Sequence, residues 1–256
     1  MLTEPQRDRI DVVLVSPRNP LNIGAAARAM ANFGFSRLAV VAPYEQHWRE
    51  ARSAVGAEDL LQNARRTESL AEAVADCTLV VGTGTLDRRK PEQPAAALPD
   101  LVSHLQHALG SGGRVALVFG PEKRGLTRED LSLCHLLVAI PTDPRQPSMN
   151  LGQCVAVCLY ELAVRPSAAT IEAAQGIARQ LPGAPDDDGA HALSGDLDRL
   201  AGVIDQVMRA VDYSPANMQA ANQHDLRLLL RRLTFTEPDT RRVLRFFRRV
   251  LRRLER

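Results

Sequence analysis

The 256-residue sequence lacks an apolar run near the ~20 residues that a membrane-spanning helix needs. Its polar start, residues 1–9, is not followed by the apolar stretch of a signal peptide. We therefore expect a cytoplasmic protein that spans no membrane. Hydrophobic residues make up 45% of the chain, enough for a sizeable core in one large or two small domains.

Cysteine is scarce and forms no metal-binding pattern. The chain has four cysteines, Cys77, Cys134, Cys154 and Cys158, and no CxxC pair. Cys154 and Cys158 fall within an apolar helical pattern. Buried free thiols are therefore favoured over a metal or redox role, and no metal is expected.

Lysine is almost absent, since Lys90 and Lys123 are the only two, and arginine supplies nearly all the positive charge. The net charge of +2 is unevenly spread: residues 222–256 hold 11 arginines and 4 acidic residues, a net of +7, which leaves −5 for the rest. Such a basic tail suits a polyanion such as nucleic acid. On charge alone, a solvated helix face in an arginine-rich protein is an equally good interpretation.

Short β-branched runs alternate with helical patterns over the first two thirds of the chain. We expect strands at residues 11–16, 37–42, 78–81, 114–119 and 136–140, and helices at 22–33, 69–75, 99–109 and 151–163. Continuous apolar runs are typical of strands buried on both faces, and intervening helices imply parallel crossovers. The pattern predicts an α/β domain over residues 1–165, a parallel sheet with helices on both faces.

Residues 166–195 lose this periodicity to Ala, Ser, Pro, Gly and three consecutive Asp, which favours a flexible linker, mobile between residues 181 and 194. A helical C-terminal extension is expected over residues 196–256, with helices at 197–208 and 217–233. A last helix should begin at Thr236, because a hydroxyl N-cap, an early proline and an acid three residues after the cap occur together.

The last predicted helix is strongly amphipathic. Its apolar face consists of Val243, Leu244, Phe247, Val250, Leu251 and Leu254. The opposite face consists of Arg241, Arg242, Arg245, Arg248, Arg249, Arg252 and Arg253. The apolar stripe must pack on this chain or on a partner.

Three polar segments follow predicted strands at their carboxyl ends, the edge where open α/β sheets bind ligands. Residues 16–28 (SPRNPLNIGAAAR) lead into a helix for which Asn22 is the expected N-cap. Residues 117–126 (LVFGPEKRGL) place a charged triplet before a second glycine, and residues 140–152 (IPTDPRQPSMNLG) are stiffened by three prolines, with Ser148 or Asn150 as helix cap. Taken singly, these segments are also compatible with a solvated helix face, a polar turn and a rigid connector.

Taken together, the segments resemble the three motifs of the SpoU (TrmH-type) branch of the SPOUT RNA methyltransferases. The family patterns N-x-G-x-x-x-R, G-x-E-x-x-G and I-P-x…S-L/M-N-L appear in the family's order as NIGAAAR, FGPEKRG and IPTDPRQPSMNL. The resemblance covers roughly residues 9–164. The helical tail is similar in layout to that of the bacterial TrmJ-type tRNA methyltransferases, which methylate the ribose of nucleotide 32 in the anticodon loop.

The resemblance implies a sheet whose C-terminal part is tied in a trefoil knot over roughly residues 78–162, which sequence reasoning alone would not propose because knots are nearly absent among folds. It also implies that S-adenosylmethionine binds to the loops of the knot, at Thr83, Gly84, Thr85, Gly120, Ile140, Pro147, Ser148 and Met149. Gly82 and Gly84 suit a close approach of backbone to ligand. No GxGxxG follows a strand, which argues against a nucleotide-dependent oxidoreductase.

The resemblance further implies that Arg28 is the catalytic arginine and that the other polar motif residues are Asn22, Glu122, Ser148 and Asn150. Since guanidinium is effectively always protonated, we expect Arg28 to orient the ribose hydroxyl and stabilise the developing alkoxide rather than act as a base. Members are homodimers in which the neighbouring subunit's motif-one arginine completes each site. RNA contacts are expected from Arg18, Arg245, Arg249 and Arg252.

The sequence therefore predicts a homodimeric, S-adenosylmethionine-dependent tRNA 2′-O-ribose methyltransferase that acts on nucleotide 32. Two alternatives remain: the same enzyme class acting on rRNA or another RNA, and a non-catalytic RNA-binding module of the same fold. The catalytic motifs do not separate tRNA from rRNA, and only the tail layout favours tRNA. A non-catalytic module would be expected to have lost Arg28 or the cofactor loops, and this sequence retains both.

Overall fold

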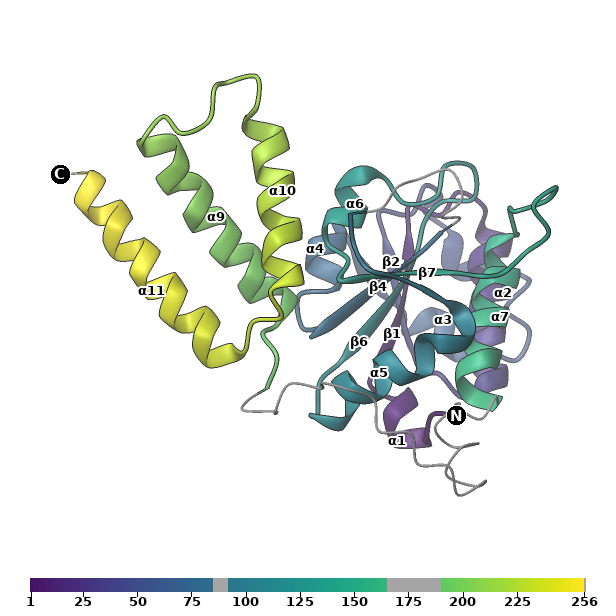
Figure 1. The fold of residues 1–256 in the computed structure, drawn as a ribbon. Helices are drawn as coiled ribbons and strands as arrows, with labels where there is room; N and C mark the ends of the chain where they lie inside the picture. Colours follow the sequence, from purple (N-terminus) through teal and green to yellow (C-terminus); the bar gives the residue numbers. More distant parts are fainter. Residues whose placement is uncertain (85–91, 165–189, 256) are drawn as a thin grey trace.

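The structure is a computed structural model that describes residues 1–84, 92–164 and 190–255. Its centre is a wholly parallel, seven-stranded sheet in the order β3-β2-β1-β6-β4-β7-β5 (Figure 1). In chain order the strands are β1 (Ile10–Val15), β2 (Arg37–Val41), β3 (Arg65–Thr67), β4 (Leu79–Thr83), β5 (Ala95–Ala97), β6 (Val115–Phe119) and β7 (Leu136–Ala139).

The five strands expected from the sequence are confirmed to within two residues at each end. The sequence did not indicate β3 and β5, which are the two edge strands of the sheet. Each has only three residues, Arg-Arg-Thr in β3 and Ala-Ala-Ala in β5. Neither carries the apolar β-branched run by which a strand is recognised, so pairing with a neighbour decides their conformation.

Helices cover both faces of the sheet, as predicted, because alternate residues of the central strands point to opposite sides. One face carries α2 (Pro20–Phe33), α5 (Leu101–Gly110) and α7 (Leu151–Val164). The other carries α4 (Leu70–Ala73) and α6 (Arg128–Ser132). The remaining short elements of this part are α1 (Glu4–Arg7), η1 (Trp48–Glu50), α3 (Glu58–Gln62) and η2 (Leu98–Asp100). The trefoil knot stays a prediction.

Helix α2 begins earlier than expected, and Asn22 is not its N-cap. The cap is Asn19, whose side chain accepts a hydrogen bond from the Leu21 N–H, and Pro20 occupies the first turn. Proline suits that position because it has no N–H to leave unpaired. At the other end Gly34 adopts φ 71°, the left-handed conformation that commonly ends a helix. Asn22 is thereby free to use its side chain elsewhere.

Three helices form the C-terminal extension, α9 (Ser194–Ala210), α10 (Gln219–Arg232) and α11 (Glu237–Leu254). Helix α9 lies between α10 and α11, and α10 faces the α4/α6 side of the sheet (Figure 1). The backbone attaches α9 to the sheet domain, since the Ser194 N–H donates to the Cys77 carbonyl and the Gly195 N–H to the Ala75 carbonyl.

The end of the expected linker is hydrogen-bonded to the start of α11 and the residues before it. Residues 190–194 are held in place: the Ala192 N–H donates to the Phe235 carbonyl, and the Glu237 N–H donates to the Ala190 carbonyl. This pairing joins segments more than 40 residues apart, so composition could not indicate it. Residues 166–189 of the linker lie outside the described residues.

The last helix forms as predicted. The Thr236 side chain accepts a hydrogen bond from the Asp239 N–H and caps α11. Val243, Leu244 and Phe247 pack against a small core of Leu200, Ala201 and Leu230. The first half of the apolar stripe is therefore covered by this chain itself, whereas Leu254 near the end is 43% exposed. The arginine face points to solvent.

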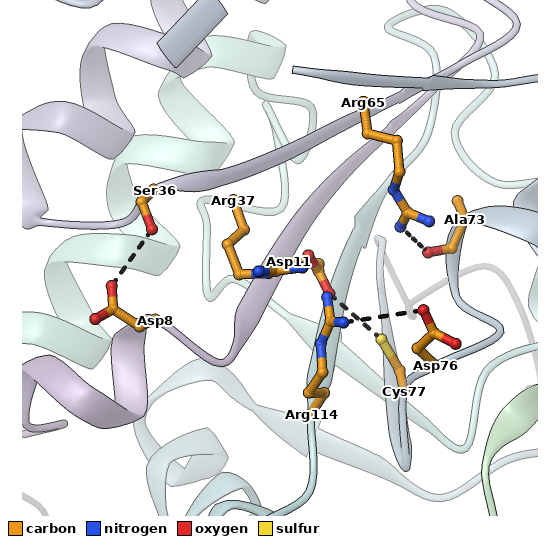
Figure 2. Close-up of polar contacts among 9 residues, drawn as sticks. All are labelled: Asp8, Asp11, Ser36, Arg37, Arg65, Ala73, Asp76, Cys77 and Arg114. Atoms are coloured by element: carbon orange, nitrogen blue, oxygen red, sulfur yellow. Dashed lines mark hydrogen bonds and ion pairs between the residues drawn. The ribbon is translucent and has the colours of Figure 1, made fainter. Parts of the chain in front are cut away.

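A buried charge cluster ties the amino ends of the strands together (Figure 2). Asp11 of β1 is 3% exposed and accepts hydrogen bonds from Arg37 at 2.9 Å and Arg114 at 2.6 Å. The Cys77 thiol lies 3.6 Å from the same carboxylate, and burial together with Asp11 raises its pKa to about 12. All four cysteines are free; Cys77, Cys134 and Cys158 are buried as expected, whereas Cys154 is only partly buried. The edge opposite the polar loops is thus cross-linked by buried charge pairs.

Among the described residues, no helix is both long and apolar enough to cross a membrane.

Candidate functional site

A pocket of about 230 Å³ opens where β4, β6 and β7 end. Because the sheet is wholly parallel, the carboxyl ends of these strands meet at one edge, and the loops that follow them form the walls. Every described residue expected at the cofactor lines this pocket: Thr83, Gly84, Gly120, Ile140, Pro147, Ser148 and Met149. Thr85 lies outside the described residues.

The glycines of the pocket serve different purposes. A Cβ on Gly120 would lie 2.3 Å from the backbone of Gly125 and Leu126, so only glycine lets this loop fold back on itself. A Cβ on Gly84 would meet nothing within 4 Å, which leaves its backbone open to a ligand. Gly82 was expected to serve ligand approach as well, but a Cβ there would lie 2.8 Å from the Cys134 sulfur. Its role is packing beneath the site.

The pocket lining combines two kinds of side chain. Leu126, Ile140, Met149 and Leu151 give it an apolar part, and Glu122, Lys123 and Arg124 give it a charged part. Sequence reasoning missed Leu126, Leu151 and the thiol of Cys154, because apolar residues after a strand or within a helix carry no signal of a site. This lining suits a ligand with an apolar ring and a charged end.

The three motifs meet in one hydrogen-bond network beside the pocket. The Asn22 amide nitrogen donates to Glu122 Oε1 at 2.6 Å, and the Asn150 amide nitrogen donates to Asn22 Oδ1 at 2.9 Å. Asn150 Oδ1 in turn accepts the backbone N–H of Gly152 at 2.9 Å and so caps α7. A Cβ on Gly152 would lie 2.7 Å from the Ala25 Cβ, so this glycine brings α2 and α7 close enough for the asparagines to meet.

The network has a single polarity. Burial tends to raise the pKa of Glu122, but hydrogen bonds from Asn22 and from the backbone N–H groups of Glu122, Arg18 and Asn19 outweigh it and lower the pKa below its usual 4.5. An ionised carboxylate only accepts, so Asn22 must present its NH₂ to Glu122 and its oxygen to Asn150. The same direction from donor to acceptor continues to Asn150, whose oxygen accepts from the N–H groups of α7. The orientation of both asparagine amides is therefore fixed.

We expect Glu122→Gln to lower the free energy of unfolding by on the order of 1 kcal/mol at pH 7, because glutamine offers one acceptor oxygen where several donors converge. A lowered pKa means that the carboxylate stabilises the fold above pH 4.5 and loses this effect as the pH falls through its folded-state pKa. The difference between the two proteins should therefore shrink below pH 4.5 in denaturant titrations. The exposed Glu68→Gln is the control; a difference independent of pH would contradict the ionised state.

Of the other residues expected to act in catalysis or RNA binding, one lines the pocket and the rest lie outside it. Ser148 lines it, although Asn150 rather than Ser148 caps the helix. Arg28 is exposed on α2 and is not among the residues of the pocket wall. The backbone N–H of Arg18 lies 3.4 Å from Glu122 Oε2, at the rim of the network. Arg245, Arg249 and Arg252 are exposed on α11 in the extension.

One group of possible metal ligands lies between α6 and α10. Single ligand atoms of Glu92, His224 and Asp225 lie within 4.8 Å of one another. The guanidinium of Arg128 already contacts all three, at 3.6, 3.1 and 4.0 Å respectively. Arginine therefore supplies the positive charge there, and the group joins the extension to the sheet domain.

The model of the SpoU rRNA Methylase family matches residues 9–160. The chain belongs to this family. The SpoU match includes all five expected strands and all three motifs, and it ends within α7.

Relatives extend the similarity beyond the SpoU region. The tRNA (cytidine/uridine/adenosine-2′-O-)-methyltransferase TrmJ of Pseudomonas aeruginosa is 44% identical over 159 residues, which is 60% of this chain and 60% of that protein. The tRNA (cytidine/uridine-2′-O-)-methyltransferase TrmJ of Klebsiella pneumoniae is 35% identical over 227 residues, 87% of this chain and 88% of that protein. The crystal structure of TrmJ from Zymomonas mobilis superposes with a TM-score of 0.77 at 29% identity and covers 96% of this chain and 99% of that one. The similarity to the last two proteins therefore includes the helical extension.

Proposed function

We propose that this chain transfers a methyl group from S-adenosylmethionine to a ribose 2′-hydroxyl of tRNA, with nucleotide 32 of the anticodon loop as the target. The observation that carries the proposal is the convergence of the three SpoU motifs, in which Asn22, Glu122 and Asn150 are bonded to one another beside the pocket. The named activity of the TrmJ relatives, which match both the sheet and the extension, supports tRNA rather than rRNA.

The pocket fits the proposed cofactor by its chemistry. Leu126, Ile140 and Met149 would cover the adenine ring, the backbone at Gly84 and Gly120 leaves room for close approach, and the charged loop faces the polar end. When bound, S-adenosylmethionine supplies an electrophilic methyl group.

Gly120→Ala should abolish measurable S-adenosylmethionine binding in calorimetry, because the added Cβ would displace the backbone of residues 125 and 126 that forms the pocket wall. The overpacking should also cost about 1–3 kcal/mol of stability. Gly110→Ala, at the end of α5, is the matched control, since a Cβ there meets nothing within 4 Å. Normal S-adenosylmethionine binding by folded Gly120→Ala protein would show that the cofactor site lies elsewhere.

The chain's own residues would act by holding the ribose hydroxyl in line with the methyl group, and such positioning can dominate the rate. Asn22 and Asn150 are fixed by the network and present a rigid polar edge. Arg28 would stabilise negative charge on the oxygen as its proton passes to water, because a guanidinium has no lone pair with which to accept that proton.

We propose a homodimer in which Arg28 of one subunit completes the site of the other. An exposed apolar face supports this: Leu21 of α2 is 54% exposed, and Val157, Tyr160 and Val164 of α7 are 37%, 50% and 47% exposed. Leu21 and Arg28 are seven residues apart on α2 and so share one side of that helix. A face that buries these apolar residues between subunits would carry Arg28 into the interface.

The double variant Val157→Asp, Tyr160→Asp should be monomeric in sedimentation and should lose methyl transfer. Burying two carboxylates in an apolar interface costs several kcal/mol each, so the variant subunits should no longer associate. Val211→Asp, at a residue that is 51% exposed in the extension, should leave the mass and the activity unchanged. A dimeric double variant would show that subunits associate through another face.

The function is tested by incubating the purified protein with radiolabelled S-adenosylmethionine and either tRNA transcripts or rRNA fragments, followed by mapping of ribose methylation. Label at one anticodon-loop ribose of tRNA is the expected result. Label in rRNA alone would establish the first alternative. Binding of both cofactor and RNA without any transfer would establish a non-catalytic module.

A further inference from the structure

The adjacent strands β1 and β2 leave the sheet through equivalent strained turns. The chain continues as Ser16-Pro17-Arg18 after β1 and as Ala42-Pro43-Tyr44 after β2. Ser16 has φ 44° and Ala42 has φ 40°, the left-handed region that residues with a side chain rarely adopt. Both precede proline, which itself favours extended backbone in the preceding residue. Two such turns side by side point to a local constraint of the kind that gathers at functional sites.

The consequence of these turns is a stacked pair of side chains. Val15 and Val41 are in register, so the two exits start level with each other. The Tyr44 N–H donates to the Pro17 carbonyl at 3.2 Å, and the Arg18 guanidinium lies 5.3 Å from the centre of the Tyr44 ring. Tyr44 is 69% exposed, so Arg18 covers one side of the ring and the other side is accessible.

The pair is attached to the proposed methylation site. The Arg18 N–H lies 3.4 Å from Glu122 Oε2, and Glu122 both lines the pocket and holds Asn22. The stacked pair therefore sits at the rim of the site, where the nucleotides next to a bound target ribose would lie.

The Arg18–Tyr44 pair differs from the structural arginine–aromatic pair of this protein. Arg49 lies 4.4 Å from the Trp48 ring centre, but Trp48 is 1% exposed and Arg49 donates to the Ala64 carbonyl, so that pair belongs to the core. No salt bridge to the Arg18 side chain is found in the described part of the chain. The Arg18 side chain is exposed and positively charged, and its ring partner offers an open face.

We infer that Arg18 and Tyr44 form a stacking platform for an unpaired nucleobase of the RNA loop that carries the target ribose. An accessible aromatic face stacks on any base, and a guanidinium beside it can contact the adjoining phosphate. The platform deepens the proposed function, on which it rests, because it selects an RNA whose bases are unstacked near the methylated nucleotide. A fully paired RNA helix offers no free base face and would not use it.

The test compares Tyr44→Ala, Tyr44→Leu and Tyr44→Trp in steady-state methylation of tRNA. Tyr44→Ala and Tyr44→Leu should raise KM for tRNA about 10-fold, equivalent to ~1.4 kcal/mol, with little change in kcat. Tyr44→Trp should keep the wild-type KM, since indole also stacks. Affinity for S-adenosylmethionine and the melting temperature should be unchanged in all three. Tyr213→Ala is the matched control, since Tyr213 is 68% exposed in the turn between α9 and α10.

A second measurement identifies the base. Anticodon stem-loops with an abasic site beside the target nucleotide should bind wild-type protein about 10-fold more weakly, and Tyr44→Ala protein should not distinguish them from the intact loop. A wild-type KM for tRNA in Tyr44→Ala protein would overturn the platform. So would a KM of Tyr44→Leu protein as low as that of Tyr44→Trp protein. A failure of the proposed function would look different, because wild-type protein would then methylate no tRNA. The affinity for intact and abasic stem-loops would still show whether Tyr44 stacks on a base.

Discussion

Arg28→Ala should lower the rate of methyl transfer by about 10²- to 10³-fold while leaving S-adenosylmethionine affinity nearly unchanged. Arg28 is exposed on α2 and is absent from the pocket wall, so its removal should disturb neither the fold nor the pocket. Single-turnover rates and calorimetric titration measure the two quantities separately. Arg28→Lys should also be poor, because a point charge does not replace the planar donor fork of guanidinium.

Mixed dimers can show in which subunit Arg28 acts. Arg28→Ala subunits retain an intact pocket, and Gly120→Ala subunits retain Arg28. If Arg28 completes the neighbouring site, a mixture of the two inactive variants should recover activity, because each mixed dimer contains one complete site. A mixture that stays inactive although mixed dimers form would place Arg28 at the pocket of its own subunit. Near-normal turnover by Arg28→Ala alone would remove the residue from the mechanism.

Replacing Arg245, Arg249 and Arg252 together by Gln should weaken tRNA binding by about 10- to 100-fold at moderate salt. The three side chains are exposed, and their spacing places them on one side of α11. Val243, Leu244 and Phe247 hold the other side against α9, so the substitutions should leave the fold intact. With fewer phosphate contacts, tRNA binding releases fewer counterions. The slope of log affinity against log salt should therefore become shallower by about 2 to 3.

The control for this experiment removes the same charge from arginines that already have partners. Arg66, Arg199 and Arg209, which lie outside the arginine face, each pair with an acidic residue two to four positions away. Their triple substitution by Gln should change affinity and salt slope little. Equal effects of the two triple variants would show that the arginine face contributes to tRNA binding only through its net charge. Unchanged affinity in the Arg245, Arg249, Arg252 variant would leave the extension a structural role.

Deleting residues 196–256 should weaken tRNA binding further and leave the pocket residues in place. The structure shows why the deletion is less discriminating than the arginine variants. It removes nearly all of α9 and the whole of α10 and α11, which cover the α4/α6 side of the sheet, and keeps only the backbone bonds of Ser194 and Gly195 to that domain. Loss of solubility through this newly exposed surface would therefore accompany any loss of RNA contacts.

The sequence by itself determined the local features of this protein. Apolar β-branched runs located five strands, and the Thr236 cap located the start of α11. The ordered motifs located the loops of the pocket and the family. These signals lie within short segments, where neighbouring residues decide the conformation, so they can be identified without knowledge of the fold.

Only the tertiary structure decided the features that join distant segments. The Asn22–Glu122 and Asn22–Asn150 bonds link residues 100 and 128 positions apart. The edge strands, the anchoring of residues 190–194 and the stacking of Arg18 on Tyr44 depend in the same way on a partner elsewhere in the chain. The physical reason is register. The register of a parallel sheet decides which strand ends lie side by side, and a local sequence pattern does not encode which distant segment becomes the neighbour.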